Sequence, residues 1–255
     1  MANFTFERIE KKYLLNEEKY NQLMNRLEPY IKLDDYGLHT ICNVYFDTDN
    51  FDLIRRSVEK PAYKEKFRVR SYGVPNDNSK VFLEIKKKYK GIVYKRRIQM
   101  DLSEAHDYLL NGVKPDLNTQ IFKEIDYMLN FYDLKPKVYI AYDRMAYSDI
   151  IGEGVRLTID QNIRSRDTKL SLKDGDEGEV LLPQGNYLME IKVPGACPLF
   201  LSNILTELEI YPNSFSKYGN VYKRMLRKNK VLNELDIAAK VTLQDKQHRK
   251  AEKIS

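Results

Sequence analysis

Basic side chains at every second position of one segment restrict the possible folds of this chain most strongly. Residues 62–72 are predicted to form a strand, and side chains alternate between the two faces of a strand. Phe67 and Val69 share one face. The other face carries Lys64, Lys66, Arg68 and Arg70. In one strand alone, this pattern describes an ordinary solvated surface equally well.

The same alternation repeats in other predicted strands, at residues 80–89, 92–101, 137–147, 154–161 and 187–193. Their charged faces carry, in turn, Phe82, Glu84, Lys86 and Lys88; Val93, Lys95 and Arg97; Tyr142 and Arg144; Arg156, Thr158 and Asp160; and Glu190 and Lys192. Like charges directly across a strand pair destabilise a sheet by up to about 1 kcal/mol each. A barrel that turns this face inward around a polyanion, with its apolar face outward under helices, relieves the repulsion.

The remaining segments favour an α+β fold with a large antiparallel sheet or barrel. Further strands are expected at residues 4–14 and 40–46. A helix is expected to start at Asn16 and to end early because of Pro29. Other helices are expected at residues 103–110, 117–132, 198–210 and 217–255. We expect one domain over residues 1–255, with a polar helical tail from about residue 235.

The composition favours a cytoplasmic protein that binds anions. Lys and Arg number 43 against 37 Asp and Glu, a net charge of +6, and this surplus favours anionic partners without identifying them. Cys42 and Cys197 provide neither a disulfide framework nor metal-ligand spacing. No apolar run reaches the roughly 18 residues of a membrane helix, and the charged residues 1–13 do not resemble a signal peptide.

The charged residues suit phosphate chemistry. Arg68 and Arg70 offer two planar guanidinium groups that bind phosphate oxygens bidentately, and Lys86 and Lys192 offer point charges. Glu190 is a carboxylate among cations, and Mg²⁺ or Mn²⁺ takes carboxylate and phosphate oxygens together. The alternative role for Glu190 is an ion pair with a neighbouring Lys or Arg.

An ordered set of short motifs resembles the triphosphate tunnel metalloenzymes (the CYTH-like superfamily), and most closely their VTC branch. That branch is the catalytic domain of the vacuolar transporter chaperone polyphosphate polymerase. The motifs, within a match from about Phe6 to Lys230, are Tyr45-Phe46-Asp47-Thr48, Arg68-x-Arg70, Glu84-x-Lys86, Tyr142-x-Arg144, Glu190-x-Lys192 and Ser216-Lys217-Tyr218. The resemblance implies an antiparallel eight-stranded β-barrel tunnel lined with Lys and Arg, flanked by helices.

The first strand helps to separate the branches of the superfamily. Hydrolases and cyclases carry Glu-x-Glu-x-Lys there, and the two glutamates bind metal. Here Arg8, Glu10 and Lys12 stand at these positions, and the arginine resembles the VTC polymerases. The resemblance therefore implies an ATP-polyphosphate phosphotransferase, which transfers the γ-phosphoryl of ATP to a growing polyphosphate chain inside the tunnel.

The resemblance also implies residue roles. The catalytic residues, which clamp the β- and γ-phosphates, are expected to be Arg68, Arg70, Lys86, Arg144 and Lys192. The phosphate path is expected to include Lys12, Lys66, Lys95, Tyr142, Arg156, Ser216 and Lys217. Glu190 and Glu10 are the expected ligands of Mn²⁺ or Mg²⁺. The expected ligands are ATP and polyphosphate, and a membrane-protein partner would have to supply any transport.

Two other functions remain open from the sequence. Glu10 and Glu190 are compatible with a metal-dependent hydrolase of tripolyphosphate or nucleoside triphosphates. A non-catalytic polyphosphate-binding module is the second alternative. Nucleic acid is not an expected partner, because the tyrosines interleaved with Lys and Arg at residues 86–97 are explained by their strand propensity.

Overall fold

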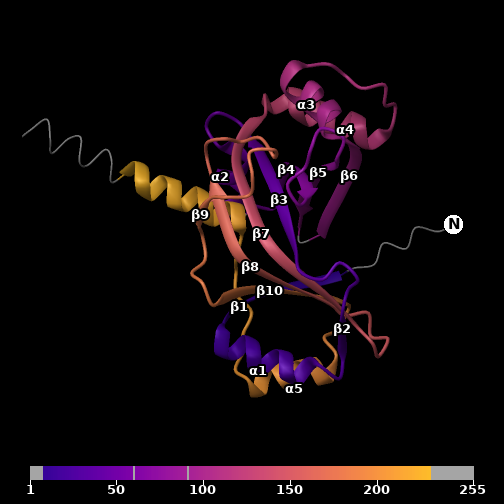
Figure 1. Ribbon diagram of the computed structural model, residues 1–255, viewed down its shortest axis with the longest axis vertical. Helices are drawn as coiled ribbons and strands as arrows, with labels where there is room; N and C mark the ends of the chain where they lie inside the picture. The colour runs from indigo at the N-terminus through magenta and orange to yellow at the C-terminus, as the bar shows by residue number, and fades with distance from the viewer. Residues whose placement is uncertain (1–7, 60, 91, 231–255) are drawn as a thin grey trace, which may run out of the picture.

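In a computed structural model of the chain, which describes residues 8–59, 61–90 and 92–230, an antiparallel sheet forms the centre of the molecule (Figure 1). Its strands are β1 (Arg8–Asn16), β2 (Ile31–Leu33), β3 (His39–Asp47), β4 (Tyr63–Tyr72), β5 (Lys80–Tyr89), β6 (Ile92–Asp101), β7 (Lys135–Asp149), β8 (Arg156–Arg166), β9 (Glu179–Val180) and β10 (Asn186–Pro194). The expected α+β class with a large antiparallel sheet is confirmed.

The strand order explains how one face of the sheet becomes an interior. Eight strands follow one another in the order β1-β10-β8-β7-β3-β4-β5-β6, while β2 pairs with β7 and β9 pairs with β8. The sheet thus has two short strands beyond the eight expected. Although β1 and β5 stand far apart in this order, Lys86 Nζ of β5 lies 3.9 Å from Glu10 Oε1 of β1. The sheet therefore curls until side chains of its edge strand β1 meet those of β5, which lies next to the opposite edge. We call the enclosed side the inner face.

Helices cover the outer face of the sheet. They are α1 (Glu17–Leu27), α2 (Asp52–Val58), α3 (Leu102–Asn111), α4 (Gln120–Tyr132) and α5 (Leu199–Glu207). A further helix over residues 217–230, called here the C-terminal helix, lies instead against the inner face. One core joins β3–β6 to α3 and α4 around Phe67, Ile85 and Ile125. Another joins β1, β8 and β10 to α1 and α5 around Leu23 and Ile159. The expectation of apolar faces outward under helices is confirmed.

A third core lies at one end of the inner face. Tyr218 and Val221 of the C-terminal helix pack there against Tyr45, Ile140 and Leu188 from three strands. The yellow helix in Figure 1 therefore lies against the curled sheet, and its amino terminus meets the inner face.

Asp47 joins this helix to α2. The buried carboxylate accepts hydrogen bonds from the backbone nitrogens of Leu53 (2.9 Å) and Ile54 (3.0 Å), in the first turn of α2. It also accepts one from the Tyr218 hydroxyl at 2.9 Å. Because a lost partner of a buried carboxylate is costly, Asp47 fixes the position of the C-terminal helix.

The local sequence signals explain most element boundaries. Asn16 accepts a hydrogen bond from the Lys19 backbone nitrogen at 2.8 Å, so it caps α1 as expected. The helix ends at Leu27, ahead of Pro29. Ile31 lies at helical spacing from Leu27, but it begins β2 and pairs with Asp149. The short α2 and β9 were also missed.

The carboxyl-terminal tail expected from about residue 235 lies outside the described residues. Among the helices that the structure describes, none is long and apolar enough to cross a membrane.

Candidate active site

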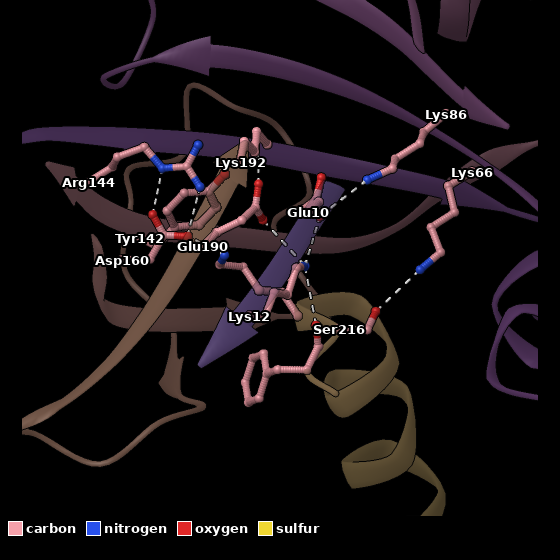
Figure 2. Close-up of polar contacts among 12 residues, drawn as sticks. Glu10, Lys12, Lys66, Lys86, Tyr142, Arg144, Asp160, Glu190, Lys192 and Ser216 are labelled. Atoms are coloured by element: carbon pink, nitrogen blue, oxygen red, sulfur yellow. Dashed lines mark hydrogen bonds and ion pairs between the residues drawn. The ribbon is translucent and has the colours of Figure 1, made fainter. Parts of the chain in front are cut away.

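Carboxylates organise the cations of the inner face. Glu84 of β5, Asp160 of β8 and Glu190 of β10 each pair with basic side chains, and all of these except Lys192 come from other elements. Figure 2 shows side chains from β1, β4, β5, β7, β8 and β10 converging on the amino terminus of the C-terminal helix. The alternation of residues along each strand brings these groups together, as the sequence pattern predicts.

Glu84 holds the first cluster. Its side chain is 2% exposed, and its Oε2 lies 2.8 Å from Arg68 Nη2 and 3.8 Å from Arg70 Nε. Its Oε1 lies 2.7 Å from Lys95 Nζ. Burial alone would raise the pKa of Glu84, but Arg68, Arg70 and Lys95 together lower it to about 2. Glu84 therefore stays ionised and fixes the two arginines beside each other.

Tyr45 and Asn43 complete the positioning of these arginines. Arg68 Nη1 donates to the Tyr45 hydroxyl at 2.8 Å, and Arg70 Nε donates to Asn43 Oδ1 at 2.9 Å. Neither Glu84 nor Asn43 nor Tyr45 had been assigned to the site from the sequence. The available signal was their position on the inner face of β3 and β5, directly opposite or beside the arginines in register.

Asp160 holds the second cluster. Arg144 binds it bidentately, with Nε 2.6 Å from Oδ1 and Nη2 2.8 Å from Oδ2, and Lys217 pairs with the same carboxylate. Lys217 Nζ also lies 4.2 Å from the centre of the Tyr142 ring. The Tyr142 hydroxyl accepts a hydrogen bond from Arg70 at 3.1 Å. Tyr142 therefore links the first cluster to the second.

The Tyr142 phenol responds to this charge. Burial would raise its pKa, but Arg70, Arg144 and Lys217 outweigh burial and lower it to about 8. The same three cations would attract a phosphate anion for the same electrostatic reason.

Glu190 holds the third cluster. Its Oε1 lies 2.7 Å from Lys192 Nζ, and its Oε2 lies 3.5 Å from Lys12 Nζ. Lys12 is also 3.9 Å from Glu10, which in turn lies 3.9 Å from Lys86. Burial would raise the pKa of Glu190, but Lys192 and Lys12 lower it well below its usual range. Glu190 makes the ion pairs of the alternative interpretation, while staying available as an ionised oxygen ligand.

The metal prediction can be tested against these carboxylates. Among residues 8–59, 61–90 and 92–230 there is no group of three or more His, Cys, Asp or Glu side chains that would hold an ion alone. Mg²⁺ is usually held by one or two carboxylates together with substrate phosphates and waters. Glu190 and Glu10, both within 4 Å of Lys12, fit such a site, in which the phosphates complete the coordination.

Lys66 and Ser216 lie at the amino terminus of the C-terminal helix. Lys66 Nζ donates a hydrogen bond to Ser216 Oγ at 3.3 Å, and the same oxygen accepts one from the Gly219 backbone nitrogen at 3.1 Å. Lys12 Nζ donates to the Phe215 carbonyl at 3.3 Å. Burial, with help from neighbouring cations, lowers the pKa of Lys66 to about 7. This end of the site is the least neutralised by carboxylates.

Arg156 differs from the other predicted residues. It lies at the exposed first residue of β8, opposite Lys192 in the strand register, and within the described residues it joins none of the three carboxylate clusters. The side chain of Arg8 lies outside the described part of the chain. A separate cavity of about 470 Å³ is lined by Glu17, Gln161, Asn162, Gln184, Gly185, Asn186 and Tyr187. It contains no predicted site residue, so charge rather than cavity volume identifies the site.

The comparisons with known proteins agree with this geometry. The sequence pattern of the VTC domain matches residues 7–226. Subunit 4 of the vacuolar transporter chaperone complex of Trypanosoma cruzi is 29% identical over 157 residues, which is 49% of this chain and 19% of that protein. This chain therefore aligns with about a fifth of that relative's length.

Solved structures share the fold. A predicted adenylate cyclase from Bacillus halodurans superposes with a TM-score of 0.52 at 18% identity, over 82% of this chain and 93% of that chain. A Hippeastrum protein, predicted to be an adenylyl cyclase and found to have a dominant triphosphatase activity, has a TM-score of 0.49 at 18% identity, over 83% of this chain and 93% of that one. The superposition with the Bacillus halodurans structure shows that the sheet has the triphosphate tunnel fold, and the sequence match over residues 7–226 shows that the chain belongs to the VTC domain family.

Proposed function

We propose that this chain is a polyphosphate polymerase that transfers the γ-phosphoryl group of ATP to the end of a polyphosphate chain. The observation that carries the proposal is the convergence of cations from β1, β4, β5, β6, β7, β10 and the C-terminal helix on one face of the curled sheet. A linear polyanion has the negative charge that relieves the repulsion among these cations and the shape to extend along this face. Membership of the VTC domain family supports the same conclusion.

The proposed reaction needs positioning and charge stabilisation more than acid–base chemistry. An oxygen of the terminal phosphate of the polymer forms a bond to the γ-phosphorus, the bond from that phosphorus to the β–γ bridging oxygen breaks, and ADP leaves with the electron pair. A terminal phosphate is already ionised near neutral pH, so no general base is required. Arg68 and Arg70, held by Glu84, would stabilise the charge on the transferring group.

The other residues have distinct proposed tasks. Lys86 and Lys192 would bind non-bridging oxygens, since both are long cations on strands facing Glu10 or Glu190. Glu190 and Glu10 would hold Mn²⁺ or Mg²⁺, and the bound ion would neutralise phosphate charge. Arg144 would clamp the phosphates together with Arg68 and Arg70. The product path would be lined by Lys12, Lys66, Lys95, Tyr142, Ser216, Lys217 and the exposed Arg156.

A tunnel triphosphatase is the second candidate. It is favoured by the two carboxylates, Glu10 and Glu190, on either side of Lys12. Incubation with ATP and Mn²⁺, followed by gel separation of polymer from free phosphate, distinguishes the two. A polyphosphate ladder with one ADP per phosphate transferred supports the polymerase. Free phosphate alone would show hydrolysis. If neither product forms, the chain would instead be a non-catalytic binding module.

The role of Glu190 is tested with a matched pair of variants. Glu190→Gln should abolish metal-dependent turnover and keep or increase tripolyphosphate affinity, because Gln is a poor Mn²⁺ ligand and removes a negative charge. Glu179→Gln is the control, since Glu179 pairs with Lys228 and Arg224 at an exposed position on β9. If Glu190 is only an ion-pair partner, the first variant will lose several kcal/mol of stability and keep its Mn²⁺ dependence.

The cellular setting is part of the proposal. The Trypanosoma cruzi relative is a subunit of a vacuolar transporter chaperone complex. By analogy, we propose that this chain works on the cytoplasmic side of a membrane-protein partner that takes up the polymer. Co-purification of the tagged chain from membranes, with and without detergent, tests this part separately.

A further inference from the structure

Four side chains stand side by side across the inner face at the level of Glu190. The strand register pairs Lys12 of β1 with Glu190, Glu190 with Thr158 of β8, and Thr158 with Ala146 of β7. Directly paired residues have Cβ atoms about 4.5–5.5 Å apart. Thr158 is therefore the nearest hydroxyl-bearing neighbour of Glu190 on β8, in the same row.

The hydroxyl of Thr158 is an anomaly in this row. Thr158 Oγ1 is buried and has no hydrogen-bond partner within the described part of the chain. Its neighbours are already engaged, because Glu190 pairs with Lys12 and Lys192. Asp160, two residues along β8, is bound by Arg144 and Lys217. A buried hydroxyl without a partner is costly and rare, so it points to a bond formed with something else.

The side chain has room to make such a bond. Thr158 as a whole is only partly buried, although its oxygen is covered. Its partner in β7 is Ala146, whose side chain is a single methyl group. Rotation about χ1 by about 120° exchanges the methyl and hydroxyl positions of a threonine, and strands accept more than one χ1 rotamer.

We propose that Thr158 is a further ligand-contacting residue, whose hydroxyl donates a hydrogen bond to a phosphoryl oxygen of the polyanion bound beside Glu190. This inference rests on the proposed function, because it requires phosphate on the inner face. Both oxygens of Glu190 face lysines, and neither accepts a hydrogen bond from Thr158. The hydroxyl thus adds a neutral donor where Lys12 and Lys192 supply charge.

The test compares Thr158→Val with Thr158→Ser. Valine keeps the shape and removes the hydroxyl, whereas serine keeps the hydroxyl and removes the methyl group. Tripolyphosphate affinity is measured by calorimetry without metal and again with Mn²⁺, and melting temperatures are measured without ligand. We expect Thr158→Val to bind about 5- to 10-fold more weakly, as loss of one hydrogen bond to a charged group predicts, with an unchanged or higher melting temperature. Thr158→Ser should restore the affinity.

The outcomes separate this inference from the proposed function. Equal affinity of the wild type and a folded Thr158→Val variant overturns the assignment of Thr158 while leaving the polymerase proposal intact. A wild type that binds no tripolyphosphate overturns both. If valine lowers the melting temperature, Thr158→Ala, which matches the neighbouring Ala146, replaces it. Failure of serine to recover affinity lost in both valine and alanine variants also overturns the assignment.

Discussion

Polyanion binding should be accompanied by uptake of a proton at Lys66. Its ammonium group is partly buried and bonds to Ser216 Oγ at 3.3 Å. The charges around it on β1, β4 and β5 are cationic: Lys12, Lys64, Arg68 and Lys86. Burial and this repulsion lower its pKa from 10.5 to about 7. A bound phosphate reverses the local charge and removes the cause of the shift.

The number of protons taken up on binding follows from the lowered pKa of Lys66. With a pKa of about 7, roughly a tenth of Lys66 is protonated at pH 8 in the empty protein, so binding at that pH should take up about 0.9 proton. At pH 6 the uptake should be about 0.1 proton. Affinity for tripolyphosphate should therefore fall by up to about tenfold per pH unit above 7.

The pKa of Lys66 in the folded chain lies below its value of 10.5 in the unfolded chain. A rise in pH therefore favours folding, although it weakens binding of the polyanion. The unfolded chain binds more protons at Lys66 between pH 7 and 10.5, and this residue's contribution to the free energy of unfolding therefore rises with pH across that window.

Calorimetry in two buffers with different ionisation enthalpies measures the proton uptake directly. Lys66→Arg is the matched control, because arginine keeps the charge and stays protonated throughout this range. It also carries the same background from ionisation of the ligand. Equal proton uptake by the wild type and Lys66→Arg at pH 8 would refute the reasoning, as would a wild-type affinity with the same pH dependence as the variant.

Three further changes test the packing and charge of the site. Arg68→Ala should lower turnover by about 10²–10³-fold in a steady-state assay, because a donor to the transferring phosphoryl is lost; near-normal turnover of folded protein excludes that role. Glu84→Gln should reduce the free energy of unfolding at neutral pH by about 3 kcal/mol, which is what the fall in the pKa of Glu84 from 4.5 to about 2 represents. This contribution is present above pH 4.5 and is lost as the pH falls through about 2. Denaturant unfolding checks it against Glu207→Gln, an exposed ion-pair partner expected to lose under about 1 kcal/mol; equal losses would contradict the prediction. Tyr218→Phe should cost about 1–3 kcal/mol in the same assay, because buried Asp47 loses a donor, and an unchanged midpoint would show that this bond does not anchor the C-terminal helix.

The alternation of residues was sufficient to predict the sheet and its inner face. The alternation from Lys64 to Arg70 correctly predicted which face of β4 is turned inward. The capping and turn residues predicted the start of α1 and the boundaries of β4 to β6 almost to the residue. The alternation is a reliable signal, because a strand that slips by one residue turns every side chain to the wrong face. The fold was therefore predictable from residues close together in the sequence.

The missed elements depend on contacts with residues outside the elements themselves. Ile31 fits the spacing of α1, but pairing with Asp149 draws it into β2. The α2 helix starts after Phe51 in a left-handed conformation and gains its stability from Asp47, which lies outside it. Neither contact produces a periodic pattern of residues that could be recognised in the sequence.

The pairing of charges was also beyond the sequence, and it divides the predicted site into two kinds of cation. Arg144 lies 2.6 and 2.8 Å from the two oxygens of Asp160, which is 1% exposed, so breaking that pair would strand a buried charge. Lys12 lies 3.5 Å from Glu190 and 3.9 Å from Glu10, a longer and weaker attachment. Its ammonium group also donates to the Phe215 carbonyl at 3.3 Å and has further donors that can turn toward a phosphate. Coulomb attraction falls with distance, so an arriving phosphate competes easily for Lys12 and poorly for Arg144. In the proposed polymerase, a lysine of this kind would transfer from carboxylate to phosphate as the polymer moves, while an arginine of the other kind would keep its place and present a fixed positive edge along the polymer's path.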